Sequence, residues 1–124
     1  MSTRANIIVT DGYNELIFYR HSDGYPDGAM PLLEAFLSMV QNNQIRNNVC
    51  QASGWLVILG YSEYNGHTLE MPNGDGLGWK VGAIEPTVGI HGDIEYLYVV
   101  DLKNKEIKID GKNGFKYQGK FNES

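Results

Sequence analysis

Two segments of this sequence place a histidine two residues before an aspartate. His21 and Asp23 form the first pair, and His91 and Asp93 form the second. In an extended chain, residues two positions apart point to the same side, and a carboxylate beside an imidazole can fix the tautomer of the ring and raise its basicity. If the two segments met in the folded chain, these four side chains could act as general acid and base or as metal ligands.

A structural role is the alternative for both pairs. Each pair lies where a predicted strand meets a loop. At such junctions an aspartate commonly turns the backbone, and a histidine often only bonds a nearby carbonyl. The spacing alone does not separate this role from ligand binding or catalysis, so all three remain open.

Arg20 is a further candidate because it lies inside an apolar strand segment. A buried guanidinium is costly unless it is paired, so we expect it to bond Asp23, Glu85 or Asp93, or to receive an anionic ligand. Tyr25, restrained by the proline that follows it, could supply a rigid apolar wall. We therefore predict one polar pocket or patch beside the sheet. Its predicted ligand-binding residues are Arg20, His21, Asp23, Tyr25, Glu85, His91 and Asp93.

The motifs of common enzyme and cofactor sites are absent. The sequence has no Walker loop, GxGxxG, HExxH, paired CxxC or nucleophile elbow. Cys50 is the single cysteine, which excludes an intrachain disulfide, and we expect both Cys50 and Trp55 to lie in the core. We predict no cofactor and no resident metal.

Size and charge exclude several classes of partner. The 124 residues suit a single domain spanning residues 1–124. The net charge is −5 and no run of lysine or arginine occurs, so we expect no non-specific binding to nucleic acid. The apolar runs are too short to cross a bilayer, and the first residues lack the apolar core of a signal peptide. We therefore expect a cytoplasmic protein with no membrane partner.

The first half of the chain predicts two strands followed by two helices. Residues 6–10 and 15–21 are rich in β-branched and aromatic side chains and flank a turn, which indicates a hairpin. Apolar residues at helical spacing predict a helix over residues 29–42. Residues 48–64 fit either a helix or a buried strand. We favour the helix, with Asn48 as its N-cap, because the pattern extends over about three turns.

The second half predicts strands joined by short turns. Residues 94–102 are apolar on both faces, which is typical of a central strand buried on both sides. A strand over residues 79–84 should end at Glu85 and Pro86, because proline cannot donate to a ladder. The remaining predicted elements are a glycine-rich loop over residues 66–78, an outer strand over residues 105–110, a last strand over residues 115–118 and a frayed tail over residues 119–124. This order predicts an α+β fold with a mainly antiparallel sheet of about five strands and two helices packed on one face.

Five sequence blocks along the chain form a distinctive set. They are TRANI, YRHSDGYP, GWLVILG, WKVGAIEPT and HGDIEYLYVVDL. With these blocks the chain resembles a family of small uncharacterised proteins from phages, prophages and bacterial genomes. The resemblance implies a cytoplasmic protein expressed from a mobile element or an infected cell, where small accessory proteins often bind and inhibit a host factor. Because that family has no established activity, the resemblance supplies context rather than chemistry.

Two hypotheses for the function follow. The first is a phage- or prophage-type accessory protein that acts as a non-enzymatic binder of a host macromolecule or a small ligand. The alternative is a small phosphodiesterase-like hydrolase, since the distant His21 and His91 are similar to the two motifs of the two-histidine phosphoesterases. Asp23 and Asp93 replace the hydroxyl residues of those motifs, however, and would repel an anionic substrate.

Overall fold

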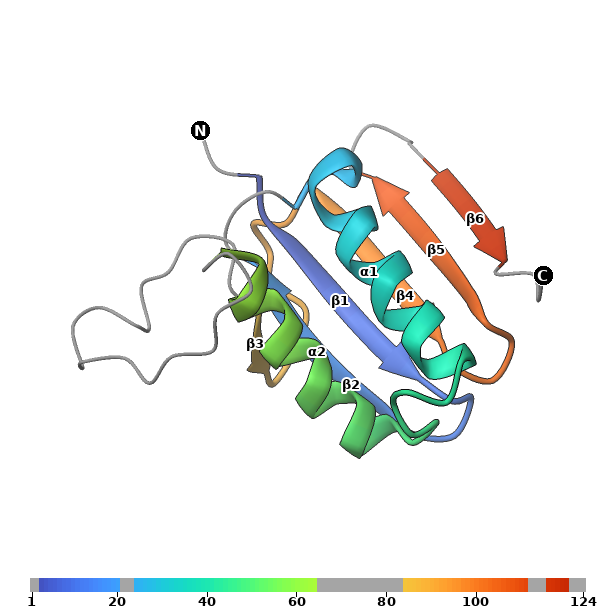
Figure 1. Cartoon of the computed structure of the whole chain (residues 1–124). Helices are drawn as coiled ribbons and strands as arrows, with labels where there is room; N and C mark the ends of the chain where they lie inside the picture. The colour runs from blue at the N-terminus through green and yellow to red at the C-terminus, as the bar shows by residue number, and fades with distance from the viewer. Residues whose placement is uncertain (1–2, 21–23, 65–83, 112–115, 121–124) are drawn as a thin grey trace, which may run out of the picture.

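The computed structural model describes residues 3–20, 24–64, 84–111 and 116–120. Two helices lie side by side on one face of a single sheet (Figure 1). In chain order the elements are β1 (Ala5–Thr10), β2 (Glu15–Arg20), α1 (Pro26–Gln41), α2 (Val49–Tyr64), β3 (Ile84–Thr87), β4 (Tyr96–Asp101), β5 (Glu106–Gly111) and β6 (Lys116–Lys120). The predicted α+β class and the order of the elements are confirmed.

The sheet has six strands in the order β3-β2-β1-β4-β5-β6. Four of its five pairings are antiparallel, and β1 pairs with β4 in parallel. The predicted antiparallel character therefore holds for most of the sheet, which is mixed at its centre. The parallel pairing arises because the chain passes through both helices and β3 before β4 enters the sheet on the free side of β1.

The first hairpin forms where the turn residues predict it. The Asp11 carboxylate accepts hydrogen bonds from the backbone amides of Tyr13 and Asn14, at 2.9 and 2.8 Å. These bonds stabilise the ionised carboxylate and hold the pKa of Asp11 below its ordinary value. Gly12 has a φ of 93°, a conformation that glycine adopts at no steric cost.

Helix α1 begins earlier than predicted and ends where predicted. Pro26 stands at its first turn, where the missing amide hydrogen costs no hydrogen bond, so the helix begins at Pro26 and not at residue 29. Asn42 caps its C-terminus, and Asn43 takes a positive φ of 62°. One face of α1 is buried against the sheet, and its residues are Ala29, Leu32, Leu33, Phe36, Leu37 and Val40.

Residues 49–64 form helix α2, so the helical alternative is confirmed over the buried strand. The Asn48 side chain accepts a hydrogen bond from the amide of Gln51 at 3.0 Å, as an N-cap does. Ala52 and Leu56 are buried toward the sheet. Cys50 is exposed and Trp55 is 45% exposed, so the expectation that both lie in the core is wrong, because these residues fall outside the stripe that faces the sheet.

Three predictions for the later strands need correction. Strand β3 continues through Glu85 and Pro86 instead of ending there, because it is an edge strand, where proline is tolerated. Strand β5 is not an outer strand, since β6 pairs with its far side. Gly119 and Lys120 belong to β6 and not to a frayed tail. The predicted loop over residues 66–78, residues 79–83 and residues 121–124 lie outside the described part of the chain.

Both helices cover the same face of the sheet, which we call the helix face. Its buried side chains on the strands are Ile7, Val9, Phe18, Tyr98, Val100, Ile107 and Ile109. We call the opposite side of the sheet the open face. Leu97 and Val99 of β4 point to it and are only partly buried. Strand β4 is therefore central as predicted, but the prediction that both its faces are buried is wrong, because the described helices leave one face uncovered.

Candidate functional site

Tyr19 and Arg20 are neighbours in β2 and point to opposite faces of the sheet. Arg20 pairs in register with Ala5 and Ile84 and is 1% exposed on the helix face. Tyr19 pairs with Glu85, so these two side chains share the open face. The alternation of β2 places Arg20 and Glu85 on opposite faces of the sheet, and Asp23, the other predicted partner near it in the chain, lies outside the described residues.

The loop that connects β3 to β4, residues 88–95, bends back onto the open face. The backbone amide of His91 donates a hydrogen bond to the side-chain oxygen of Asn6 at 2.8 Å. The amide nitrogen of the same Asn6 side chain donates to the carbonyl of Phe18 at 2.8 Å. Asn6 is fully buried, and it clips the loop to the backbone of β2 through both of its polar atoms.

The imidazole of His91 lies flat on the phenol ring of Tyr19. The ring centroids are 3.9 Å apart with an interplanar angle of 17°. The Nε2 atom of His91 and the Oγ1 atom of Thr87 share a hydrogen bond of 2.8 Å. The ring is thus fixed by a stacking partner and by a hydrogen-bond partner, both of which come from the sheet.

Two side chains, from β2 and from the residue before β1, contact the carboxylate of Asp93. The hydroxyl of Tyr19 donates to its two carboxylate oxygens at 3.1 and 3.0 Å, and Nε of Arg4 lies 3.5 Å from the carboxylate. Burial first, then the bond to Asp93, raises the pKa of Tyr19 above its ordinary value of 10.0. Tyr19 therefore stays protonated at neutral pH and acts as a hydrogen-bond donor.

These contacts form one cluster on the open face, which we call the loop tether. Its members are Arg4, Asn6, Tyr19, Thr87, His91 and Asp93. Gly92 and Asp93 form a turn, so the segment is not extended as the hypothesis assumed. His91 and Asp93 contact different partners and do not pair with each other. Nε2 of His91 and the carboxylate of Asp93 both bond other members of the cluster. In this arrangement the cluster holds the loop in place.

The structure brings only some of the predicted site residues together. Glu85 lies beside the loop tether, exposed on the open face, and its charge also contributes to the raised pKa of Tyr19. Tyr25 is 42% exposed at the N-terminus of α1, where its carbonyl accepts hydrogen bonds from the backbone of the first turn. His21 and Asp23 lie outside the described residues, so their predicted meeting with the second pair stays a prediction.

Sequence reasoning missed four members of the loop tether. Arg4, Asn6, Tyr19 and Thr87 contribute as much to it as the two predicted residues. Asn6 offered a usable signal, because a polar residue inside a β-branched strand needs a partner when it is buried. No sequence pattern showed that the loop before β4 folds back over β1 and β2.

The loop tether presents two apolar side chains at the rim of the open face. Val88 is fully exposed and Ile90 is 51% exposed. Further along this face, four apolar side chains are only partly buried, and they are Ile8, Ile17, Leu97 and Val99. Charged residues lie on the same face, and these are Glu15, Glu85, Asp101, Glu106, Lys108 and Asp110.

Comparisons with known proteins add nothing to the geometry of the site. No protein-family model, curated protein or solved structure matches this chain. Within residues 3–20, 24–64, 84–111 and 116–120, no three His, Cys, Asp or Glu side chains gather where they could hold a metal ion. Neither α1 nor α2, the helices of the described part, has the length and apolar character that crossing a bilayer requires.

Proposed function

We propose that this protein is a non-enzymatic binder of a protein partner, and that it engages this partner through the open face and the loop over residues 88–95. One observation carries the proposal. The loop tether holds residues 88–95 on the open face, and this loop exposes Val88 and Ile90. The same face carries partly buried apolar side chains and is not covered by either described helix. Contiguous exposed apolar surface with a polar rim is typical of protein interaction sites.

The charge of the surface favours a protein partner over nucleic acid. Among the strand residues of the open face whose side chains the structure describes, five are acidic and one is a lysine, and they are Glu15, Glu85, Asp101, Glu106, Lys108 and Asp110. A phosphate backbone would be repelled by this excess, and by the net charge of −5. A protein with an apolar patch inside a basic rim would be attracted to it.

The resemblance to small phage and prophage proteins supplies the biological setting of the proposal. In that setting the partner is a host protein of the bacterial cytoplasm, and the accessory protein acts by occupying a surface of that host factor. The hydrolase alternative gains no support from the geometry. Nε2 of His91 bonds Thr87 and the carboxylate of Asp93 bonds Tyr19, which leaves neither group free for a substrate in this arrangement.

Site-specific photocrosslinking in living bacterial cells tests the proposal. A photoreactive amino acid is placed at Val99, in the middle of the open face, or at Glu34, which is exposed on α1. We expect a crosslinked product of one defined mass from position 99 and none from position 34. Equal products from both positions, or none from position 99, would contradict the proposal.

Variants of the rim then connect the captured protein to the proposed surface. The captured protein is purified, and its affinity is measured for the wild type and for the Val88→Asp and Ile90→Asp variants. Each variant should bind at least about tenfold more weakly, the usual effect of removing an apolar anchor, with an unchanged circular dichroism spectrum. Unchanged affinity would contradict the role of the rim. Hydrolysis of bis-p-nitrophenyl phosphate by the wild type, lost in His91→Ala, would support the enzyme instead.

A further inference from the structure

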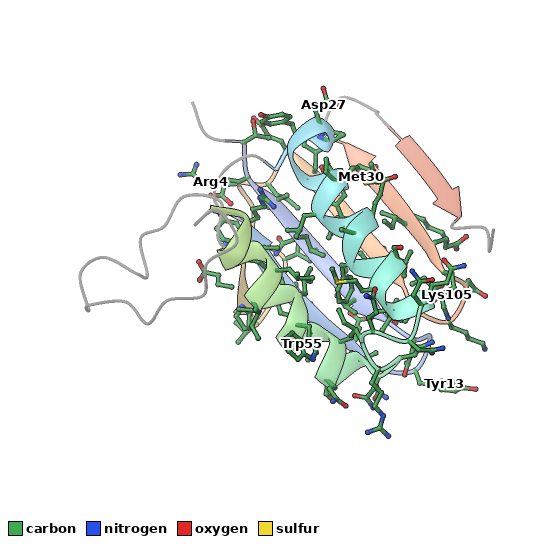
Figure 2. The ribbon with its side chains drawn as sticks, in the orientation of Figure 1. Arg4, Tyr13, Asp27, Met30, Trp55 and Lys105 are labelled. Atoms are coloured by element: carbon green, nitrogen blue, oxygen red, sulfur yellow. The ribbon has the colours of Figure 1, made fainter. Side chains whose placement is uncertain are left out.

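Helix α2 has an outer surface that differs from the rest of this acidic protein. No charged residue occurs between Arg46 and Glu63, and α2 covers most of that interval. Trp55 lies on this helix and is 45% exposed (Figure 2), and Ile58 is partly exposed, while Val57 packs against the core. A helix that is apolar on several sides is normally covered on several sides, whereas α2 packs against the sheet and α1 and still leaves Trp55 exposed.

Two glycines of α2 differ in their described surroundings. A Cβ atom added at Gly60 would lie 3.1 Å from two side-chain atoms of Ile84, so close packing against β3 explains that glycine. A Cβ atom added at Gly54 would meet nothing within 4 Å. Glycine in the interior of a helix is less favourable than alanine, and no described neighbour explains it at position 54. The close approach of another backbone would explain it.

We propose that the outer face of α2 packs against α2 of a second copy of this chain, across a two-fold axis near Gly54. A two-fold contact places the same patch on both partners, so the patch must be complementary to itself. Trp55 supplies a large exposed side chain and the adjacent Gly54 supplies an open space, so each copy presents both halves of the contact.

The distribution of charge favours a second copy of this chain as the partner that covers α2. Two molecules with a net charge of −5 repel each other, and the cost is least where the surfaces that meet carry no charge. Helix α2 supplies such a surface, while α1 carries the exposed acidic residues Asp27 and Glu34. A membrane surface fits less well, because an interfacial helix is normally rich in Lys and Arg and α2 contains neither.

Self-association is measured by sedimentation from about 1 μM to about 1 mM, the range in which weak dimers dissociate. We expect a concentration-dependent dimer of the wild type. Trp55→Glu should weaken it by at least about tenfold, and Gly54→Leu should weaken it comparably by filling the contact. Glu34→Lys on α1 is the matched control and should leave a dimer through α2 intact. Circular dichroism verifies that each variant is folded.

Chemical crosslinking through Cys50 gives a second measurement of self-association. It is the single cysteine and is exposed, one turn before Gly54, so a short bis-maleimide can join two chains only through this residue. We expect covalent dimers from the wild type and few from Trp55→Glu.

Three results would overturn the proposal. The first is a monomer throughout the concentration range, and the second is a dimer that Trp55→Glu and Gly54→Leu leave unchanged. The third is a dimer that Val99→Asp dissociates, since it would assign self-association to the open face. Because α2 and the open face lie on opposite sides of the sheet, failure here is distinguishable from failure of the proposed function.

Discussion

The two faces of the sheet are held together by different physical means. The helix face is a largely apolar layer in which strand residues such as Val100 pack against the buried sides of α1 and α2. At one end of the open face, Asn6, Tyr19 and His91 hold a loop by directed hydrogen bonds and a ring stack. The helix face therefore supplies most of the stability of the fold, while the contacts on the open face fix the shape of the exposed loop.

The largest expected effect on stability comes from a comparison of two neighbouring residues of β4 that lie on opposite faces of the sheet. Val100 is fully buried on the helix face, and Val99 is partly exposed on the open face. Val100→Asp should cost about 4 kcal/mol or more, because an unpaired carboxylate would be buried. This is a large share of the roughly 5–15 kcal/mol that stabilises a small domain. We expect Val100→Asp to be unfolded or insoluble by circular dichroism.

Val99→Asp is the matched control of that experiment. The new carboxylate would face Lys108 across the pair of strands, and it would remain in contact with water. We expect a change in the free energy of unfolding within about 1 kcal/mol. If urea denaturation showed equal losses for both variants, the distinction between the two faces would be wrong.

Asn6 allows the contribution of the open face to be measured directly. Asn6→Ala removes both hydrogen bonds of the clip and leaves the amide of His91 and the carbonyl of Phe18 without this partner. We expect a loss of about 1–3 kcal/mol in urea denaturation. Thr10→Ala, on the same face of β1 and bonded to the nearby Asn14, should cost less than about 1 kcal/mol. Equal costs would contradict the role of the buried clip.

A smaller effect is expected at Tyr19. Tyr19→Phe keeps the ring that stacks on His91 and removes the hydroxyl that donates to Asp93. We expect a loss of about 1 kcal/mol, the usual worth of such a bond. Faster amide hydrogen exchange of residues 88–95 should accompany it, with no change in β5. Unchanged exchange in the loop would show that the hydroxyl does not hold it.

Alkaline pH should weaken both faces through their buried phenols. Burial raises the pKa of Tyr98 above 10.0, and burial together with Asp93 raises the pKa of Tyr19. A phenol whose pKa is higher in the folded state stabilises the fold below pH 10 and loses this contribution as the pH rises through its folded pKa. In the wild type, part of the rise in absorbance at 295 nm that reports tyrosine ionisation should therefore occur only above pH 10. This part should be smaller in Tyr19→Phe and in Tyr98→Phe. Identical titrations of the variants and the wild type would contradict this.

The sequence predicted those features that depend on local pattern. Alternation and turn chemistry predicted the first hairpin, and helical spacing with Asn48 as a cap predicted α2. The parallel pairing of β1 with β4 was not predicted, because a strand pattern does not specify which distant strand will be its neighbour. The outer strand assigned to residues 105–110 was wrong for the same reason.

The candidate site was predictable only in part. His91 and Asp93 could be identified as polar residues near the core, but their partners Asn6 and Tyr19 come from strands distant in the sequence. Arg20 could be identified as a residue that needs a partner inside an apolar strand, but the sequence did not show which element covers it at 1% exposure. Contacts of this kind depend on tertiary packing, which periodicity does not encode.

The parallel contact between β1 and β4 also determines when this chain can complete its fold. Ala5 pairs with Tyr96 and Thr10 pairs with Asp101, so the centre of the sheet joins the two ends of the sequence. Contacts this far apart in sequence slow folding, because a long loop must close before they form. During synthesis the hairpin of β1 and β2 must wait with one edge unpaired until β4 leaves the ribosome. A chain truncated before β4 would therefore retain an exposed strand edge, and we expect it to aggregate.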